Sequence, residues 1–472
     1  MLEASPSYLG LGGWKPRNTE LERRRGRNMR TSIRVLVRNG LLIAALFLLI
    51  LSLFCCEGDD PADGAYTTET ETVVSTDTTP IQIETGDATD TDSTGDDTDT
   101  HTDTDEESTR EDLFNLAIPQ GDYSLTFENL DVLGSEHNVV VFVIDRFDWE
   151  YYDRARTASP EIFYNLDNGG FTYFKDSISL YPRTFPSIAY MVTGVENDFS
   201  MSRSDYFHAA YGGSEFMRAL YNAGYDINVY TDSYYGYINA APMANYAQNA
   251  KPSEGGFDVY STDMKQIYSH LTDGDMTVGE GKKSYKFIHL LGTHLPLVYD
   301  ENFEIIPEGD SRRNNTTIGL KASFAIINRY IDEMKRLGVY DNATIIITGD
   351  HTSIGSDKAV PLRWAHVTPL FVKPASCSSG ELVISEAPVS HADMFPTVLK
   401  SEGFADYTGF GESVFDIPET EMRERLYYFQ KLDTVDGVTN YEMVIFRIWG
   451  KAADYDNWEI VNRYYLGKSI YK

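Results

Sequence analysis

The sequence predicts an α/β protein with a doubly wound, mostly parallel central sheet flanked by helices, followed by a small antiparallel appendage at the C-terminus. Two continuous β-branched and apolar runs, 138–144 and 343–348, have the composition of strands buried on both faces of a parallel sheet. A helical pattern at 320–334 leads into the second run. Strand, helix and strand in this order form the repeating unit of doubly wound folds.

The other elements continue this alternation. Runs at 227–230 and 285–291 predict two further strands. Beyond residue 410 the chain is rich in Tyr and Trp, and short runs such as 441–446 predict the antiparallel appendage. The apolar residues of the predicted helix recur every three or four positions, which places them on one face; they are Leu320, Phe324, Ile327, Ile331 and Met334.

The N-terminus has the layout of a membrane-targeting segment. Residues 1–39 hold nine basic and three acidic side chains, and residues 40–56 are uncharged and almost wholly apolar. The positive-inside rule keeps the basic region in the cytoplasm and places the chain after residue 56 outside it. Seventeen residues are at the short end for a spanning helix. A transmembrane signal anchor and a lipoprotein signal peptide are therefore both open, with Met1 or Met29 as the start.

Residues 57–112 predict a disordered, acidic, Thr/Asp-rich stalk. The segment contains twenty acidic side chains, one basic side chain and almost no large apolar residue. It cannot bury enough apolar surface to offset its ordering entropy, and its like charges keep it extended. The folded part then divides into a large domain, 113–410, and a small C-terminal subdomain, 411–472.

Charge and cysteine content exclude several classes of function. The formal net charge is −32, and the acidic excess extends beyond the stalk into the folded part, so no basic face is available for a nucleic acid. The three cysteines are Cys55, Cys56 and Cys377. They are too few and too poorly spaced for a disulfide framework or a cysteine-based metal site.

Two motifs at strand ends carry candidate metal ligands. Asp145 directly follows the first predicted strand, and Gly349, Asp350 and His351 follow the second. An isolated Asp at a strand end usually caps a helix, so the prediction depends on the pairing of the two motifs. Ligands of doubly wound sheets bind at the carboxyl ends of the strands. Two carboxylates and an imidazole suit one divalent ion; we expect Mn²⁺, with Zn²⁺ or Mg²⁺ as alternatives.

Thr184 stands at the start of another predicted helix, because an apolar stretch, 188–192, follows it and ends at Gly194. A hydroxyl in this position lies at the positive end of the helix dipole, among backbone N–H groups without helical partners. That environment favours a bound phosphate and a more acidic alcohol. The alternative is that Thr184 only caps the helix.

Five motifs resemble the sulfatase-like branch of the alkaline phosphatase superfamily. This branch includes lipoteichoic acid synthases, phosphoethanolamine transferases and true sulfatases, and the resemblance spans residues 137–410. The motifs stand in the order found in that branch: Phe142-Val143-Ile144-Asp145, Arg183-Thr184-Phe185-Pro186-Ser187, His289-Leu290-Leu291-Gly292-Thr293-His294-Leu295-Pro296, Thr348-Gly349-Asp350-His351 and His391-Ala392-Asp393-Met394-Phe395-Pro396-Thr397.

The resemblance implies a metal-ligating set and a nucleophile. Asp145, Thr184, Asp350 and His351 would hold the ion, and Thr184 would also attack the substrate. Lipoteichoic acid synthases and phosphoethanolamine transferases generally have Glu where this chain has Asp145. The shorter side chain changes the reach of that ligand.

Histidines and one arginine near these motifs have open roles. By resemblance, His294 would hold a phosphate oxygen or protonate the leaving group. His366 resembles a further histidine of phosphoethanolamine transferases, with a structural role as the alternative. We interpret His289 as a core strand histidine and His391 as part of a helix start. Arg183 would neutralise a phosphoryl oxygen or lie on the surface.

The residues aligned with the sulfatase nucleophile predict attack on phosphorus. Sulfatases use a formylglycine made from Cys or Ser in Cys-x-Pro-x-Arg, whereas this chain has Thr184 and, in the arginine position, Ile188. Threonine cannot yield that aldehyde. The expected activity is therefore that of an extracytoplasmic, metal-dependent hydrolase or transferase acting on phosphate esters of lipid headgroups or envelope glycopolymers, anchored at the cell membrane.

Three alternatives are left open. Related synthases carry a multi-helix membrane domain and this chain has one apolar segment, so transfer and hydrolysis are both possible. A non-catalytic surface lipoprotein could keep the fold as a binding module. A nucleotide pyrophosphatase-like phosphodiesterase would need a second metal, and no Asp-x-x-x-His segment for it is evident around His294.

Overall fold

The computed structural model describes residues 116–231, 238–253, 264–352, 367–401, 403, 411–435 and 438–467. All of them belong to the unit Asp103–Lys472. The predicted basic region, apolar segment and stalk lie outside the described residues, as does His366. None of the helices within the described ranges combines the length and the hydropathy needed to cross a bilayer.

The core of the protein is one seven-stranded sheet with the strand order β11-β4-β10-β9-β3-β8-β5. Neighbouring strands run parallel except where β10 pairs with β9 and with β4, so six strands share one direction and β10 opposes them. The sheet is therefore mostly parallel, as predicted. The strands are β3 (His137–Ile144), β4 (Thr172–Ile178), β5 (Tyr225–Tyr230), β8 (Lys283–Leu290), β9 (Ala343–Gly349), β10 (Leu370–Lys373) and β11 (Val383–Ser390).

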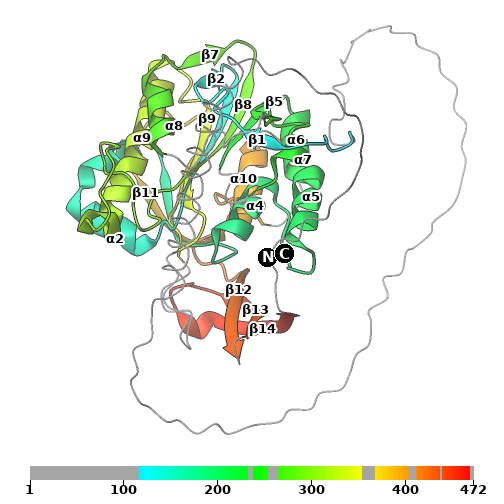
Figure 1. The fold of residues 1–472 in the computed structure, drawn as a ribbon. Helices are drawn as coiled ribbons and strands as arrows, with labels where there is room; N and C mark the ends of the chain where they lie inside the picture. The colour runs from blue at the N-terminus through cyan, green and yellow to red at the C-terminus, as the bar shows by residue number, and fades with distance from the viewer. Residues whose placement is uncertain are drawn as a thin grey trace, which may run out of the picture. The chain divides into compact units, whose positions relative to one another are not determined.

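Helices cover both faces of this sheet, which confirms the doubly wound arrangement (Figure 1). Alternate strand residues face opposite layers: Val141 and Ile346 pack in one buried cluster, and Phe142 and Ile345 pack in the other. The first layer holds α4 (Thr184–Thr193), α5 (Arg203–Gly213), α6 (Glu215–Asn222), α7 (Ala240–Met243) and α10 (Met394–Ser401). The second holds α2 (Trp149–Ala158), α3 (Tyr164–Asn168), α8 (Met264–Thr272) and α9 (Thr316–Arg336).

The longest helix, α9, confirms the predicted helix and shows what its apolar stripe does. All five residues of the predicted stripe are fully buried against the sheet, and each buried side chain of this kind stabilises the fold by about 1.5–3 kcal/mol. Asn315 caps the start by accepting from the Thr317 amide, and Lys335 and Arg336 complement the dipole at the end.

A close contact joins α9 to the loop after β8. A Cβ on Gly319 would lie 2.3 Å from the carbonyl oxygen of Gly292, so only glycine allows the helix to pack there. Gly292 itself has φ of +53°, and a Cβ on it would lie 2.2 Å from a methyl carbon of Ile144. The loop that begins at Gly292 is thus held between α9 and the end of β3.

The predicted antiparallel appendage is a meander of β12 (Glu424–Val435), β13 (Val438–Trp449) and β14 (Trp458–Gly467). Its link to the central sheet is the fully buried Arg425, which pairs with the Asp176 carboxylate at 3.0 Å and donates to the Val389 carbonyl at 3.0 Å. The Tyr428 amide also donates to the Leu180 carbonyl at 2.9 Å. The appendage thereby supports the segment that leads into α4.

The short pieces β1 (Tyr123–Leu125) and β6 (Ala250–Pro252) pair antiparallel, and β2 (Val132–Gly134) and β7 (Thr277–Gly279) pair parallel. Single turns of 3₁₀ helix occur at Pro160–Phe163, Ser311–Asn314, His391–Asp393 and Tyr455–Asn457. They complete the connections around the two helical layers.

Candidate metal centre

Two buried carboxylates lie at the carboxyl edge of the sheet. In the register of β3 and β9, Ile144 pairs with Gly349, so Asp145 and Asp350 follow at the same level on neighbouring parallel strands. Both side chains are 0% exposed. Burial raises the pKa of Asp145 well above its usual range, and the charge of Asp350 raises it further. Burial also raises the pKa of Asp350. Two neighbouring carboxylates that are both fully buried need a counter-charge if both are to be ionised.

The carboxylate oxygens of Asp145 and Asp350 differ in whether they accept hydrogen bonds. Oδ1 of Asp350 accepts from the amides of Arg146 at 2.9 Å and His351 at 2.8 Å. Oδ2 of Asp350 and Oδ1 of Asp145 are buried without a hydrogen-bond partner in the described structure. Buried acceptors are rarely left unsatisfied, and a bound cation is one of the few groups that satisfies two carboxylates at once.

The backbone around Asp145 is held in an uncommon conformation. Arg146 has φ of +57°. This conformation costs a non-glycine residue of order 1–3 kcal/mol, and it persists only where the surrounding structure holds it in place. Here Thr293 fixes it, because its hydroxyl oxygen lies 2.8 Å from the carbonyl oxygens of both Asp145 and Arg146 and its one proton is shared between them. Gly349 is required beside this turn, since a Cβ there would lie 2.7 Å from the Phe147 carbonyl. Three strand ends are thus interlocked.

His351 presents a lone pair to this site. Its Nδ1 lies 2.7 Å from the Thr352 carbonyl, which can only accept, so Nδ1 carries the proton and Nε2 does not. Nε2 lies 3.4 Å from Oδ2 of Asp350 and 3.9 Å from Oδ1 of Asp145. Burial lowers the pKa of His351 to about 3, which keeps the ring neutral. A neutral, oriented imidazole is a metal ligand.

Thr184 brings a hydroxyl to the same point. It is the first residue of α4, and Arg183 occupies the N-cap position without a side-chain cap hydrogen bond, so Thr184 is not a helix cap. Its Oγ1 lies 3.2 Å from Nε2 of His351 and 3.5 Å from Oδ2 of Asp145. Both partners are groups that the sequence predicted as metal ligands.

His289 joins the cluster as well. It is fully buried on β8, as the interpretation of a core strand histidine requires, but its Nε2 lies 4.0 Å from Oδ2 of Asp145. One ligand atom each from Asp145, His289 and Asp350 lies within 4.8 Å of the others. Nδ1 of His289 is 2.9 Å from the Thr231 hydroxyl, and burial lowers the pKa of His289 to about 4. The sequence alone did not place His289 in the site, because its position depends on the strand register: His289 pairs with Val143, close to the end of β3.

The other predicted residues lie around this cluster or outside the described chain. His294 follows β8 on the loop held by Gly292 and is partly buried. Burial, and then the charge of Arg146, lower the pKa of His294 to about 4. His391 begins the turn His391–Asp393, as predicted, with its Nε2 3.5 Å from the hydroxyls of Thr348 and Thr368. His366 is not described.

The separations fit a single small cation. Ligands at ~2.1 Å from a tetrahedral ion are roughly 3.4 Å apart. The contacts among Asp145, Thr184, Asp350 and His351 range from 3.2 to 3.9 Å. The donor set of carboxylates, imidazole and hydroxyl suits Mn²⁺, Zn²⁺ or Mg²⁺. The geometry therefore brings together all four predicted metal ligands and adds His289 beside them.

Comparisons with known proteins place this site in a family. A sequence profile described as Sulfatase matches residues 137–403. Lipoteichoic acid synthases of Staphylococcus aureus, strains USA300 and NCTC 8325, are 26% identical over 149 residues, which cover 28% of this chain and 23% of theirs. The chain thus spans about a quarter of the length of these curated relatives.

Solved structures with a similar arrangement include a protein in the alkaline phosphatase superfamily from Vibrio parahaemolyticus, with 15% identity and a TM-score of 0.43, covering 70% of this chain and 83% of that one. A lipoteichoic acid synthase from Listeria monocytogenes has 12% identity and a TM-score of 0.44, covering 74% and 91%. Because the profile match extends over more than half of the sequence and includes every residue of the described cluster, the chain belongs to the Sulfatase family.

Proposed function

We propose that this chain is a metal-dependent hydrolase or transferase in which Thr184 attacks the phosphorus of a phosphate ester. The observation that carries the proposal is the position of the Thr184 Oγ1, 3.2 Å from Nε2 of His351 and 3.5 Å from Oδ2 of Asp145. Because Arg183 and not Thr184 is the N-cap, this hydroxyl is not used to cap the helix, and its nearest polar partners are the buried Asp145 and His351. Asp145, Asp350, His351 and Thr184 are the proposed ligands of one divalent ion.

A divalent ion would supply Lewis-acid chemistry, by lowering the pKa of a bound hydroxyl and by stabilising charge on phosphoryl oxygens. The chain supplies the rest. The Thr184 hydroxyl loses its proton as its oxygen forms a bond to phosphorus. The bond to the leaving oxygen breaks, that oxygen takes up a proton and departs as an alcohol, and the phospho group is held on Thr184 as an ester. An acceptor alcohol or water then attacks that phosphorus and restores the hydroxyl.

His294 and two arginines serve the substrate in this proposal. The resemblance gives His294 the role of holding a phosphoryl oxygen or protonating the leaving group. Burial lowers the pKa of His294 to about 4, so its ring is neutral at neutral pH, which favours the hydrogen bond to a phosphoryl oxygen. Arg146 and Arg183 adjoin Asp145 and Thr184 in the sequence, and their charges lower the pKa of His351. We propose that both arginines attract the anionic substrate. His366 lies outside the described residues, and its role as a further histidine of the site is proposed from the resemblance alone.

Phosphate is favoured over sulfate as the reacting group by the nucleophile itself. Thr184 cannot be converted to formylglycine, the aldehyde that sulfatases use. The S. aureus relatives are lipoteichoic acid synthases by name, which supports an envelope polymer or lipid headgroup as substrate. We expect Mn²⁺ as the ion, and the acidic stalk and N-terminal apolar segment to hold the enzyme at the outer side of the cell membrane.

The alternatives differ in what they require of the site. A binding module without turnover has no need for an intact set of ligands around a hydroxyl, and here the set is intact. A two-metal phosphodiesterase requires a second ion; among the described residues a single group of three candidate ligands is found. Metal content per chain, measured by elemental analysis of the purified protein, separates one ion from two.

The proposal is tested by comparing ester classes on the full-length chain in detergent. 4-Nitrophenyl phosphodiester, 4-nitrophenyl sulfate and phospholipid substrates are incubated with Mn²⁺ or with EDTA. We expect metal-dependent turnover of the phosphodiester or of the phospholipid and none of the sulfate. Sulfate release without phosphoester activity would overturn the substrate class. Thr184→Ser and Thr184→Ala form the matched pair, because serine keeps the hydroxyl and alanine removes it.

A further inference from the structure

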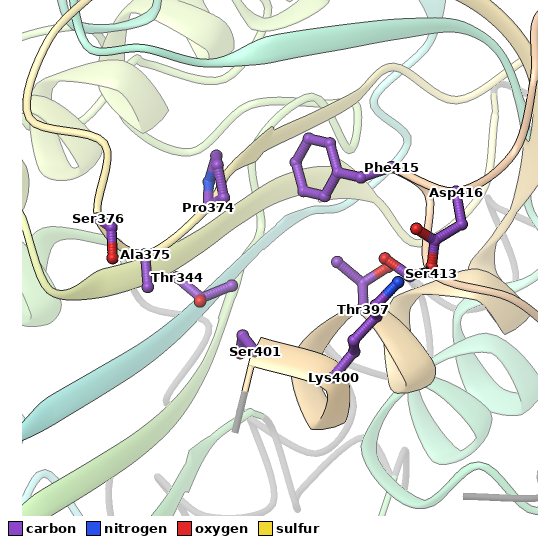
Figure 2. A pocket seen from close by; sticks show the side chains of 10 residues that line it. All are labelled: Thr344, Pro374, Ala375, Ser376, Thr397, Lys400, Ser401, Ser413, Phe415 and Asp416. Carbon is purple, nitrogen blue, oxygen red and sulfur yellow. Dashed lines mark hydrogen bonds and ion pairs between the residues drawn. The ribbon is translucent and has the colours of Figure 1, made fainter. Parts of the chain in front are cut away.

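A cavity of about 260 Å³ is lined by residues of β9, of α10 and of the segments 374–376 and 413–416 (Figure 2). Thr344, which lines it, is the second residue of β9, and Asp350 follows six positions later. At about 3.3 Å per strand residue, the cavity and the metal centre are roughly 20 Å apart. The cavity therefore belongs to the amino edge of the sheet, where none of the predicted catalytic residues lies.

The cavity has one apolar wall and one polar wall. Figure 2 shows Phe415 and Pro374 on one side and Lys400, Ser401 and the end of α10 on the other. The Phe415 ring packs edge-on against buried Phe174, with centroids 5.8 Å apart, and is 44% exposed. An aromatic ring that is anchored on one side and open on the other offers a flat face to a ligand.

Thr344 gives the cavity an unsatisfied hydroxyl. The residue is 1% exposed, and its Oγ1 has no hydrogen-bond partner within the described chain. Two other hydroxyls in the lining already have partners: Thr397 Oγ1 donates to the Asp393 carbonyl and accepts from the Val414 amide, and Ser401 donates to the Val398 carbonyl. A buried hydroxyl that lines a cavity and lacks a partner points to a ligand with a polar group at that position.

Charge decides the class of that ligand. Among the lining residues that the structure describes, Lys400 is the one cation, and it is paired with the Asp416 carboxylate. The cavity also meets the C-terminal end of α10, where the helix dipole is negative. A free anion is therefore not favoured. A free cation is not favoured either, because the Asp416 carboxylate is already paired with Lys400. A purely apolar ligand would leave the Thr344 hydroxyl unsatisfied.

We propose that this cavity binds a neutral sugar ring. A pyranose offers hydroxyls to Thr344 and to the Lys400 and Asp416 pair, and an apolar face of C–H groups to Phe415. Pockets for larger ligands typically exceed about 300 Å³, so a cavity of about 260 Å³ suits a single ring or one unit of a longer saccharide. The site is separate from the metal centre and does not require it to be active.

The test uses the full-length chain in detergent and ligand-observed saturation-transfer NMR. The probes are glucose, N-acetylglucosamine and galactose, with inorganic phosphate as the anionic comparison. Phe415→Ala removes the stacking face and Thr344→Val removes one hydroxyl at constant size. Trp449→Ala is the matched control, because Trp449 is an exposed aromatic that does not line the cavity. Circular dichroism and thermal unfolding establish that each variant is folded.

We expect saturable binding of at least one sugar, weakened about 10-fold or more by Phe415→Ala and several-fold by Thr344→Val, and unchanged by Trp449→Ala. Thr184→Ala should leave sugar binding intact, so a failure of the catalytic proposal would not affect this result. The proposal is overturned if no sugar saturates below 50 mM in this titration (about 2 kcal/mol of binding), if phosphate alone binds, or if Phe415→Ala binds as the unaltered chain does.

Discussion

The two ends of strand β9 show how one strand supports two kinds of site. At its carboxyl end, Asp350 lies fully buried beside Asp145, and backbone amides and the Thr293 hydroxyl lock the surrounding turns. At its amino end, Thr344 lines an open, electrically neutral cavity. A buried ion costs several kcal/mol without a counter-charge, whereas a buried hydroxyl without a partner costs about 1–3 kcal/mol. We therefore expect a cation at the carboxyl end and only a hydrogen bond at the amino end.

The largest expected effect is at the carboxyl end, from loss of the nucleophile. Thr184→Ala should lower kcat on a phosphodiester by at least about 10³-fold, because no other hydroxyl replaces its oxygen. Thr184→Ser should keep measurable turnover. Steady-state kinetics of the two variants provide the measurement. Equal losses in both would show that the γ-methyl group, and not the oxygen, is what the site needs.

The second-largest expected effect comes from metal removal, which should affect the carboxyl end of β9 and not its amino end. EDTA is expected to abolish turnover and to lower the unfolding temperature, because an ion present at 100 times its Kd stabilises the folded state by about 2.7 kcal/mol. Added Mn²⁺ should restore both properties. Sugar binding at the amino edge should be unaffected. Turnover that persists after exhaustive chelation would contradict the metal-dependent mechanism.

Asp350→Asn should have opposite effects on stability with and without the ion. A folded pKa raised above the unfolded value makes a carboxylate cost stability as the pH rises from about 4 through the raised pKa. In EDTA at pH 7, removing that charge should stabilise the protein by about 1–2 kcal/mol. In Mn²⁺ the same change should destabilise it. Differential scanning calorimetry in both buffers gives the sign; the same sign in both would argue against a cation between the carboxylates.

A smaller, pH-dependent effect should come from His391. Burial lowers its pKa to about 3, below the unfolded value of about 6.5. The unfolded ring then gains its proton first, so stability is complete above about pH 6.5 and is lost as the pH falls toward 3. His391→Gln should reduce the difference in urea midpoint between pH 7 and pH 4.5. An unchanged difference would mean that His391 titrates normally.

The smallest effect on catalysis should come from the amino edge. Phe415→Ala should leave the kcat and KM of a small phosphodiester within about twofold, because residues this far from the reacting atoms act independently. The measurement is the same kinetic assay used for Thr184. A large loss would show that the two ends of β9 are coupled and would weaken the contrast between them.

Local sequence patterns were sufficient to predict the sheet and its chemical edge. The runs 138–144 and 343–348 are β3 and β9 almost to the residue, because a strand buried on both faces leaves few polar positions. The rule that ligands meet at the carboxyl ends of parallel strands placed Asp145 and Asp350 together. The helix 320–334 lies within α9 for a similar reason, since its apolar spacing matches one helix face.

Features that depend on tertiary register were beyond the sequence. His289 looks like any core residue until β8 is aligned with β3. The reversed strand β10 has only four residues and gives no directional signal. Arg146 adopts a positive φ because Thr293, almost 150 positions away, holds its carbonyl oxygen. The cavity at Thr344 is lined by residues of β9, of α10 and of the segments 374–376 and 413–416, and no local pattern encodes this combination.

Mass spectrometry of the covalent intermediate tests the central claim most directly. The full-length chain is mixed with a phosphodiester substrate and Mn²⁺, quenched in acid during turnover and digested. We expect a phospho adduct on the peptide that contains Thr184, absent in EDTA and absent from Asp350→Asn. Turnover with Thr184 unmodified at every time point, or an adduct on another residue, would contradict the account.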